Sequence, residues 1–321
     1  MNTLAHWISP ETIQVLSWTL VHFLWQGAAL AALLWFVLTS IRSASGRYVA
    51  SVITLGLMLS APIATFVTLA SQTGETNNPQ STRLVHSIST SVMITTPAAE
   101  QAASSSAGTN ITRWLVEGWL IGVVALSLRS AGGLLLLGRL RRQSARAVSV
   151  PLKDACLTLQ RRMGLRRLIE YCESHQVDAP AVIGWLRPVV LLPFTAMTGL
   201  SREQLEAVIA HELAHIKRMD AVVNLFQMFV ETVLFYHPAV WWVSRRIRVE
   251  REHCCDDMAV AICGDRLEYA RALTLMEGWR AMPRMALAAN GGSLTARVKR
   301  LLGMETFQST RAVGFAVGLV C

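Results

Sequence analysis

The sequence predicts a mainly helical integral membrane protein with three to four transmembrane helices and an α+β domain in the cytosol. Three observations support this fold class. Of the 321 residues, 52% are hydrophobic and only 16% are charged, which is more apolar than a typical soluble domain. Three long apolar stretches lie within residues 1–138. The segment 139–306 combines basic residues with helical and strand patterns, which indicates a folded domain outside the membrane.

The three apolar stretches are each long enough to span a bilayer. Residues 13–39 carry no formal charge and can cross about 30 Å of hydrocarbon as a helix. This stretch is too long for a cleavable signal peptide, and no basic segment precedes it. Residues 48–70 and 114–137 have the same apolar character. We therefore expect three retained transmembrane helices.

Basic residues predict the orientation of these helices. Two arginines lie between the first two stretches and many basic residues follow the third, whereas residues 71–112 are nearly free of them. Because positive charge marks the cytoplasmic side, we place the N-terminus and the loop 71–112 outside and residues 139–306 in the cytosol. The loop is polar, and we expect it to be weakly ordered. No stretch interleaves basic and aromatic residues, so the net charge of +9 does not indicate a nucleic-acid partner.

The last segment, 307–321, ends in a short apolar run. Residues 312–321 are too few to span a membrane alone. They are either the start of a fourth transmembrane helix or a segment that lies in the interface. We favour the fourth helix, which would place whatever follows it outside.

The segment "LSREQLEAVIAHELAHIKRMD" carries the strongest chemical signal. Ser201 and Gln204 form a capping-box pattern, and the apolar residues that follow recur at helical spacing. His211 and His215 therefore lie one turn apart on one face, where both can bind the same metal ion. In zinc peptidases the glutamate after the first histidine acts as the general base, the role we expect for Glu212. The alternative is a chance H-E-x-x-H on a solvated helix.

A catalytic zinc site needs a third protein ligand and an open position. The downstream residues that could supply the ligand are Glu231, His237, Glu250, Glu252 and His253. We favour Glu252, because Asp256 follows one turn later and can hold a zinc-bound imidazole by its free N–H. Glu250 has no carboxylate at that spacing. The side chains of Cys254 and Cys255 should point away from the helix face that carries Glu252, and we expect them to be packing residues. The alternative is that Glu252 and Asp256 belong to a charged helix face.

The segment 221–243 is apolar enough to resemble a further membrane span. Because His211 and Glu252 flank it and must reach one ion, both its ends lie on one side, and Pro238 interrupts it. We expect an interfacial helix whose polar stripe, between Asp220 and Glu231, faces the catalytic helices. A buried core helix is the alternative.

Upstream, "APAVIGWLRPVVLLPF" predicts a strand pair or an edge strand. Its β-branched runs are separated by Gly184 and two prolines, a pattern typical of short strands. Peptide substrates often bind by adding a strand to such an edge. This segment is therefore a candidate for substrate binding, and a purely structural hairpin is the alternative.

Taken together, these residues resemble the BlaR/MecR-type regulatory membrane metallopeptidases. The resemblance rests on "LVHFLWQGAAL", "PAVIGWLRPVVLLP", "LSREQLEAVIAHELAHIKRMD", "FYHPAVWWVSRRIRVEREHCCDD" and "SLTARVKRLLG", which cover most of the chain. It implies a gluzincin-type zinc domain between the third and fourth membrane helices. It also implies that His211, His215 and Glu252 are the Zn²⁺ ligands, that Glu212 is the general base, and that Asp256 holds a ligand histidine in position. The CAAX prenyl endopeptidases share the two motifs but have more membrane helices.

The resemblance has one departure. The best-known members carry an extracellular penicillin-binding sensor after the fourth helix, and no S-x-x-K motif for acylation by a β-lactam occurs in these residues. We therefore expect any sensor to be an extracellular partner or a missing C-terminal domain.

The expected function is that of a zinc metalloendopeptidase in a bacterial inner membrane. Family logic suggests a regulated cleavage of a cytosolic protein, such as a transcriptional repressor, or of the enzyme itself, in transmembrane signalling. The alternative is a non-proteolytic signal transducer with a structural zinc site. Structural sites usually close the fourth position with Cys or His, so two histidines, one glutamate and an adjacent Glu212 favour hydrolysis. A transporter-like protein is disfavoured by the large basic segment. The expected partners are a protein substrate and the lipid bilayer.

Overall fold

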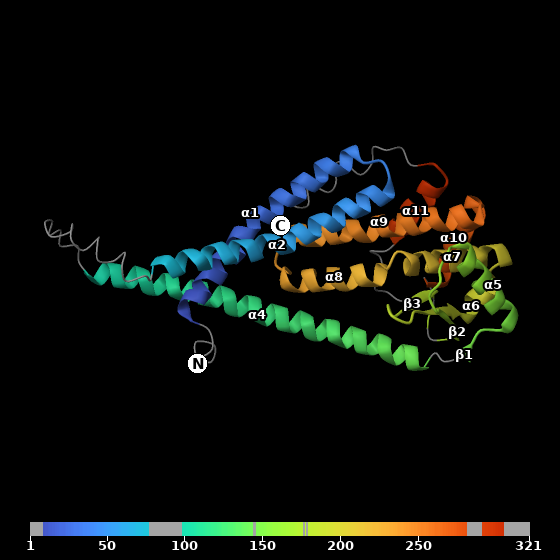
Figure 1. The fold of residues 1–321 in the computed structure, drawn as a ribbon, viewed down its shortest axis with the longest axis horizontal. Coiled ribbons are helices and arrows are strands. Elements are labelled where there is room, and N and C mark those ends of the chain that lie inside the picture. The colour runs from blue at the N-terminus through green and yellow to red at the C-terminus, as the bar shows by residue number, and fades with distance from the viewer. Residues whose placement is uncertain are drawn as a thin grey trace. The chain divides into compact units, whose positions relative to one another are not determined.

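The computed structural model describes residues 9–76, 98–143, 146–175, 177, 179–280 and 291–304. These residues are mainly helical and include one small sheet (Figure 1), which confirms this part of the predicted fold class. They form two compact units. Unit 1 holds residues up to Ser40, 53–128 and 230–243, and unit 2 holds 41–52, 129–229 and the residues from Ser244 onward.

In the described part of the chain, three helices are long and apolar enough to cross a membrane. They are α1 (Pro10–Ser40), α2 (Ala44–Thr76) and α4 (Ala98–Gln143). Their membrane-length portions, Pro10–Ser40, Ala44–Gln72 and Ile111–Arg139, contain the three predicted stretches. The side of the membrane that each end faces stays a prediction. The predicted fourth helix lies outside the described residues.

The predicted loop 71–112 is shorter than expected. Residues up to Thr76 continue α2, and α4 already begins at Ala98, so the prediction was wrong at both ends of the loop. The segment 98–107 contains five alanines, and alanine has the highest helix propensity. Residues 77–97 lie outside the described part of the chain.

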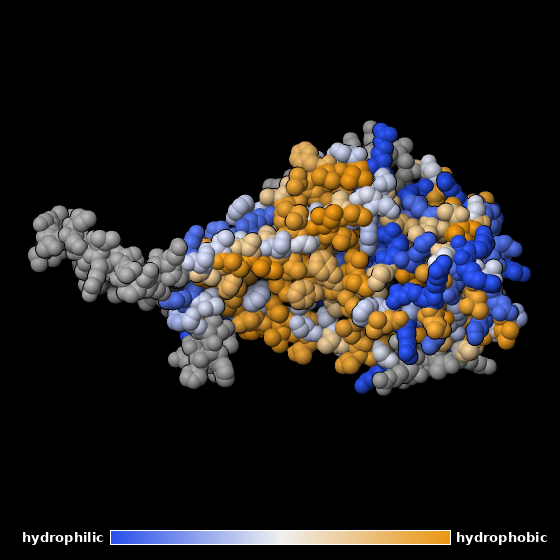
Figure 2. All heavy atoms as spheres, in the orientation of Figure 1, coloured by the Kyte–Doolittle hydropathy of each residue, from blue (hydrophilic) through white to orange (hydrophobic). Residues whose placement is uncertain are grey.

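Unit 1 has a hydrophobic surface. Large side chains of α1 are exposed to a high degree, among them Trp25 (62%) and Phe36 (65%), and the face shown in Figure 2 is mostly hydrophobic over α1 and α2. So large an apolar area is unusual in a soluble protein and normal for helices surrounded by lipid. The exposure therefore agrees with the membrane-spanning length of these helices.

The remaining helices follow α4 in the chain. They are α5 (Val150–Arg162), α6 (Phe194–Gly199), α7 (Arg202–Lys217), α8 (Asp220–Val233), α9 (Pro238–Cys263), α10 (Arg266–Arg280) and α11 (Gly291–Leu301). The helix predicted over 221–243 is two helices, since α8 ends at Val233 and α9 begins at Pro238, the residue that was expected to interrupt the segment. Proline suits the first turn of a helix, where its missing N–H has no helical partner in any case.

His237, in the turn before α9, has a structural role within unit 1. Its Nδ1 accepts a hydrogen bond from the backbone N–H of Ala239 (3.1 Å), so Nε2 carries the proton and donates to the carbonyl of Leu24 (2.9 Å). A Cβ atom at Gly27 would lie 2.6 Å from that Nε2. The glycine thus permits the close approach of α1 to the histidine.

The sheet of unit 2 has the strand order β1-β2-β4-β3. Its strands are β1 (Arg146–Ala147), β2 (Glu170–Ser174), β3 (Ala181–Ile183) and β4 (Val189–Pro193). β2 and β4 are parallel, and the other two pairs are antiparallel. The antiparallel pair β3–β4 confirms the predicted strand pair. In the sheet of the described residues, β4 is fully buried and β3 is an edge strand.

Helix α7 lies in the core of unit 2. Ile209 and Leu213 are completely buried in one cluster with Val190 and Leu192 of β4 and with Tyr269 of α10. Each such side chain contributes roughly 1.5–3 kcal/mol through burial. The predicted capping box at Ser201 and Gln204 is present, which confirms the start of the helix. The helix that carries H-E-x-x-H is therefore firmly positioned.

Candidate metal centre

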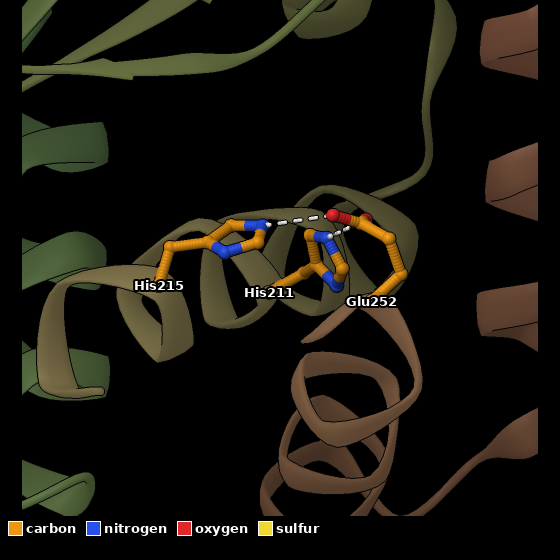
Figure 3. Close-up of side chains that lie close together, drawn as sticks. All are labelled: His211, His215 and Glu252. Atoms are coloured by element: carbon orange, nitrogen blue, oxygen red, sulfur yellow. Dashed lines mark ion pairs between the residues drawn. The ribbon is translucent and has the colours of Figure 1, made fainter. Parts of the chain in front are cut away.

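Helices α7 and α9 bring His211, His215 and Glu252 together (Figure 3). Glu252 Oε2 lies 3.5 Å from His211 Nε2, and Glu252 Oε1 lies 4.0 Å from His215 Nε2. One donor atom from each residue falls within 4.8 Å of the other two. Both imidazoles thus present Nε2 toward the carboxylate, and the three predicted ligands form one group.

The other nitrogen of His211 is held by Asp256 and Tyr269. Nδ1 lies 3.2 Å from Asp256 Oδ1 and 2.9 Å from the Tyr269 hydroxyl, which itself donates to Asp256 (2.6 Å). Arg297 donates to both oxygens of Asp256, at 2.9 and 2.6 Å. Because the acceptors surround Nδ1, that atom carries a proton, which leaves Nε2 as the nitrogen available to a metal ion. Asp256 therefore lies where the sequence argument expected a support for an imidazole.

His215 has a corresponding partner in Asp220. Its Nδ1 lies 2.8 Å from Asp220 Oδ2, and Asp220 is the first residue of α8 and is buried. The turn between α7 and α8 contains Met219 in the left-handed region (φ 57°), which returns the chain directly beside the histidine. The sequence placed Asp220 in a polar stripe but did not assign it to His215.

Cys255 is buried in the core cluster, which confirms the expected packing role, and it also touches the metal centre. Its Sγ lies 3.4 Å from His215 Nδ1 and 3.5 Å from Asp220 Oδ2, so the thiol touches the support of the metal centre. Burial raises the pKa of Cys255 well above its usual range, and the group is a neutral thiol. His215, Asp220 and Cys255 also form a compact donor group, but it uses the nitrogen that already bonds to Asp220.

Charges around His211 favour a bound cation. Although burial opposes ionisation, contacts with His211 and the nearby Arg297 charge hold the pKa values of Glu252 and Asp256 below their usual range. Burial alone would lower the pKa of His211, but the two carboxylates outweigh it and raise the pKa. Both carboxylates are therefore ionised, and positive charge beside them is stabilised.

Glu212 lines a cavity of about 730 Å³ together with the three donor residues. Val182 and Ile183 of edge strand β3, and Trp185 after it, form part of the same wall. Every lining residue of this cavity belongs to unit 2. A glutamate, a group of possible metal ligands and residues of edge strand β3 thus face one space.

Glu250 and His253 lie away from this group. Glu250 is completely buried, pairs with Arg47 (2.9 Å) and Arg246 (3.4 Å), and lies 3.4 Å from His253 Nδ1. These contacts occupy both residues in a network between α2 and α9. They agree with the preference for Glu252 over Glu250 as the third ligand.

The donor set fits zinc. Two imidazole nitrogens and one carboxylate oxygen are ligands that Zn²⁺ accepts in catalytic sites. Each histidine is also oriented by a carboxylate through Nδ1, as zinc-binding histidines usually are. Tyr269, Arg297 and the role of Asp220 were missed from the sequence, and the only signal was the polar stripe that contains Asp220. The roles of the five predicted site residues stay a prediction that this geometry supports.

Comparisons with known proteins show related sequences. A family model described as BlaR1 peptidase M56 matches residues 18–301. Regulatory protein BlaR1 of Bacillus licheniformis is 25% identical over 138 residues, which cover 43% of this chain and 23% of that protein. The methicillin resistance mecR1 protein of Staphylococcus aureus is 26% identical over 98 residues, or 30% of this chain and 17% of the relative. The matches thus span less than a quarter of the relatives' own length.

Proposed function

This chain belongs to the BlaR1 peptidase M56 family, and we propose that it is a membrane-bound zinc endopeptidase that makes a regulated cleavage in transmembrane signalling. The observation that carries the proposal is the group of His211, His215 and Glu252 in one cavity with Glu212. The name of the curated relative, a regulatory protein, supports a role in signalling. The substrate is a cytosolic protein, such as a transcriptional repressor, or the chain itself.

The side chains of α7 and α9 would perform the reaction. His211 and His215 would hold the ion through Nε2, and Glu252 would hold it through its carboxylate. A bound zinc ion supplies Lewis-acid stabilisation of the negative charge that develops on the scissile carbonyl oxygen. Glu212 takes the proton from the attacking water and transfers it to the leaving amine. Asp256 and Asp220 keep Nδ1 of each histidine protonated, so the free lone pairs point into the cavity.

Edge strand β3 provides a place for the substrate backbone. Its outer side has no strand partner among the described residues, and Val182 and Ile183 line the cavity that contains Glu212. An extended peptide could pair with β3 and present its amide bond to the metal centre. The many basic residues after α4 support a cytosolic location of this domain in a bacterial inner membrane, with the N-terminus outside. An extracellular sensor would then be a separate partner or a further domain.

The test compares wild-type protein with Glu212→Gln and Glu206→Gln, all purified in detergent. Glu206 is also on α7, pairs with the exposed Arg202 and does not line the cavity, which makes it a matched control. Zinc content is measured by mass spectrometry of the metal. Cleavage is measured on the chain itself and on a peptide library prepared from a bacterial proteome.

We expect all three proteins to bind about one zinc ion, and only Glu212→Gln to lose cleavage. Cleavage by Glu212→Gln at the wild-type rate would refute the assignment of the base. A wild-type protein without zinc would refute the metal centre. If the wild type binds zinc and cleaves neither substrate, the alternative of a signal transducer with a structural zinc site is favoured.

A further inference from the structure

The beginning of α2 contacts Asp220, the residue that supports His215. The Tyr48 hydroxyl donates to Asp220 Oδ1 at 3.2 Å, and Asp220 Oδ2 lies 2.8 Å from His215 Nδ1. Tyr48 is 8% exposed and Asp220 is 3% exposed. The two oxygens of one buried carboxylate therefore connect a residue of α2 to a predicted metal ligand.

Arg218 fixes the orientation of Tyr48. Its guanidinium carbon lies 4.4 Å from the centre of the Tyr48 ring, a cation–π arrangement. Arg218 Nε also lies 3.5 Å from the same Asp220 oxygen that Tyr48 contacts. The phenol is thus held by its ring and by its hydroxyl, and both contacts converge on Asp220.

Neighbouring residues of α2 bind α9. Arg47 pairs at 2.9 Å with Glu250, which is completely buried and precedes Glu252 by two residues in the chain. Ser45 Oγ lies 3.8 Å from Cys254 Sγ. Less than two turns of α2 therefore contact both α8 and α9, and all these contacts lie within unit 2.

We propose that Tyr48 is a positioning residue that connects α2 to the metal ligand His215 through Asp220, with the Arg47–Glu250 pair anchoring the same turn to α9. The inference rests on the proposed function. Because Tyr48 is joined to His215 through Asp220, a displacement of the beginning of α2, a helix long and apolar enough to cross a membrane, would change the orientation of the His215 imidazole. A signal carried by this membrane helix thereby alters how firmly the ion is held.

Loss of the Tyr48 hydroxyl should act on metal binding. Without it, Asp220 Oδ1 keeps only the longer contact with Arg218, and the carboxylate is freer to rotate away from His215. One hydrogen bond of this kind corresponds to a change of about 2- to 10-fold in an equilibrium constant. We therefore expect Tyr48→Phe to bind zinc about 2- to 10-fold more weakly than the wild type.

Tyr171→Phe is the matched control. Tyr171 is 5% exposed, also lies in unit 2, and donates to Gln160 Oε1 at 3.1 Å, away from the metal centre. Both variants remove one buried phenolic hydroxyl, so a purely structural role predicts similar effects. Zinc affinity of the full chain in detergent is measured by competition with a chelator. The visible spectrum of the cobalt(II)-loaded protein reports the ligand geometry.

The expected result is weaker zinc binding and a changed cobalt spectrum for Tyr48→Phe but not for Tyr171→Phe. In an Asp220→Asn background, Tyr48→Phe should cause little further change, because the residue acts through that carboxylate. Equal effects of the two tyrosine variants, an unchanged Tyr48→Phe protein, or additive effects with Asp220→Asn would overturn the inference. If the wild type binds zinc and cleaves, such a result contradicts only the role of Tyr48. A wild type that binds no zinc contradicts the proposed function as well.

Discussion

Replacement of Asp256 by asparagine should weaken both the metal centre and the fold. The carboxylate is completely buried, faces His211 Nδ1 at 3.2 Å, and accepts two hydrogen bonds from Arg297. Asparagine keeps one acceptor oxygen but turns an N–H group toward the donors of Arg297. Loss of such a support for a metal-binding histidine costs about 10- to 100-fold in metal affinity.

The cost to stability follows from the charge left on Arg297. Breaking a buried ion pair from one side costs about 3–5 kcal/mol. The Arg297 side chain is 16% exposed and lies 3.5 Å from Glu252, so we expect a value near the lower end, about 3 kcal/mol. Chemical denaturation of the zinc-free protein in detergent measures this loss, and chelator competition measures the affinity.

Asp257→Asn serves as the control for this prediction. Asp257 is adjacent on α9 and also pairs with an arginine, Arg300 at 2.6 Å, but its side chain is 53% exposed. An exposed pair contributes about 0–1 kcal/mol, and this one lies outside the donor group. The reasoning fails if Asp256→Asn is no more destabilising than Asp257→Asn and leaves zinc affinity unchanged.

Two further predictions concern residues away from the metal centre. Gly27→Ala places a Cβ 2.6 Å from His237 Nε2 and should destabilise the protein by about 1–3 kcal/mol. In Gly56→Ala the added Cβ meets no atom within 4 Å, and this variant should be more stable than the wild type by roughly 0.5–1 kcal/mol. Comparable thermal unfolding midpoints for the two variants would contradict this packing argument. Burial raises the pKa of Cys156 to about 12, so the thiol stays neutral at pH 8 and should be alkylated by iodoacetamide only after unfolding, because the thiolate is the reactive form. Mass spectrometry of the labelled protein checks this, and fast labelling of Cys156 in the folded state would show that it is not buried.

Features that depend on local spacing could be predicted from the sequence. The capping box at Ser201 and the common face of His211 and His215 follow from the geometry of a single helix. The same holds for Glu252 and Asp256, which are one turn apart. The antiparallel strands around Gly184 were also predictable, because a glycine separates two β-branched runs. In the structure this glycine adopts φ 90°, as a turn between two strands often requires.

Features that depend on tertiary packing could not be predicted. Tyr269 and Arg297 reach Asp256 from α10 and α11, so no spacing within one helix connects them. Asp220 reaches His215 because Met219 adopts a left-handed conformation. Residues other than glycine rarely adopt this conformation, so it could not be predicted from the sequence. The loop boundaries were wrong for a different reason, since an alanine-rich segment with high helix propensity extends α4 beyond its apolar part.

The ligands of the metal centre come from two separate helices, with consequences for stability. His211 and His215 are fixed relative to each other by α7, whereas Glu252 comes from α9, so a bound ion would cross-link two elements of the fold. A ligand that binds only the folded state stabilises it by about 4 kcal/mol when its concentration is 1,000 times Kd. The free energy of unfolding would then increase with the fraction of the protein that has bound the ion. Removal of the ion by a chelator would loosen the attachment of α9 to α7, and thermal unfolding with and without zinc would report how full the site is.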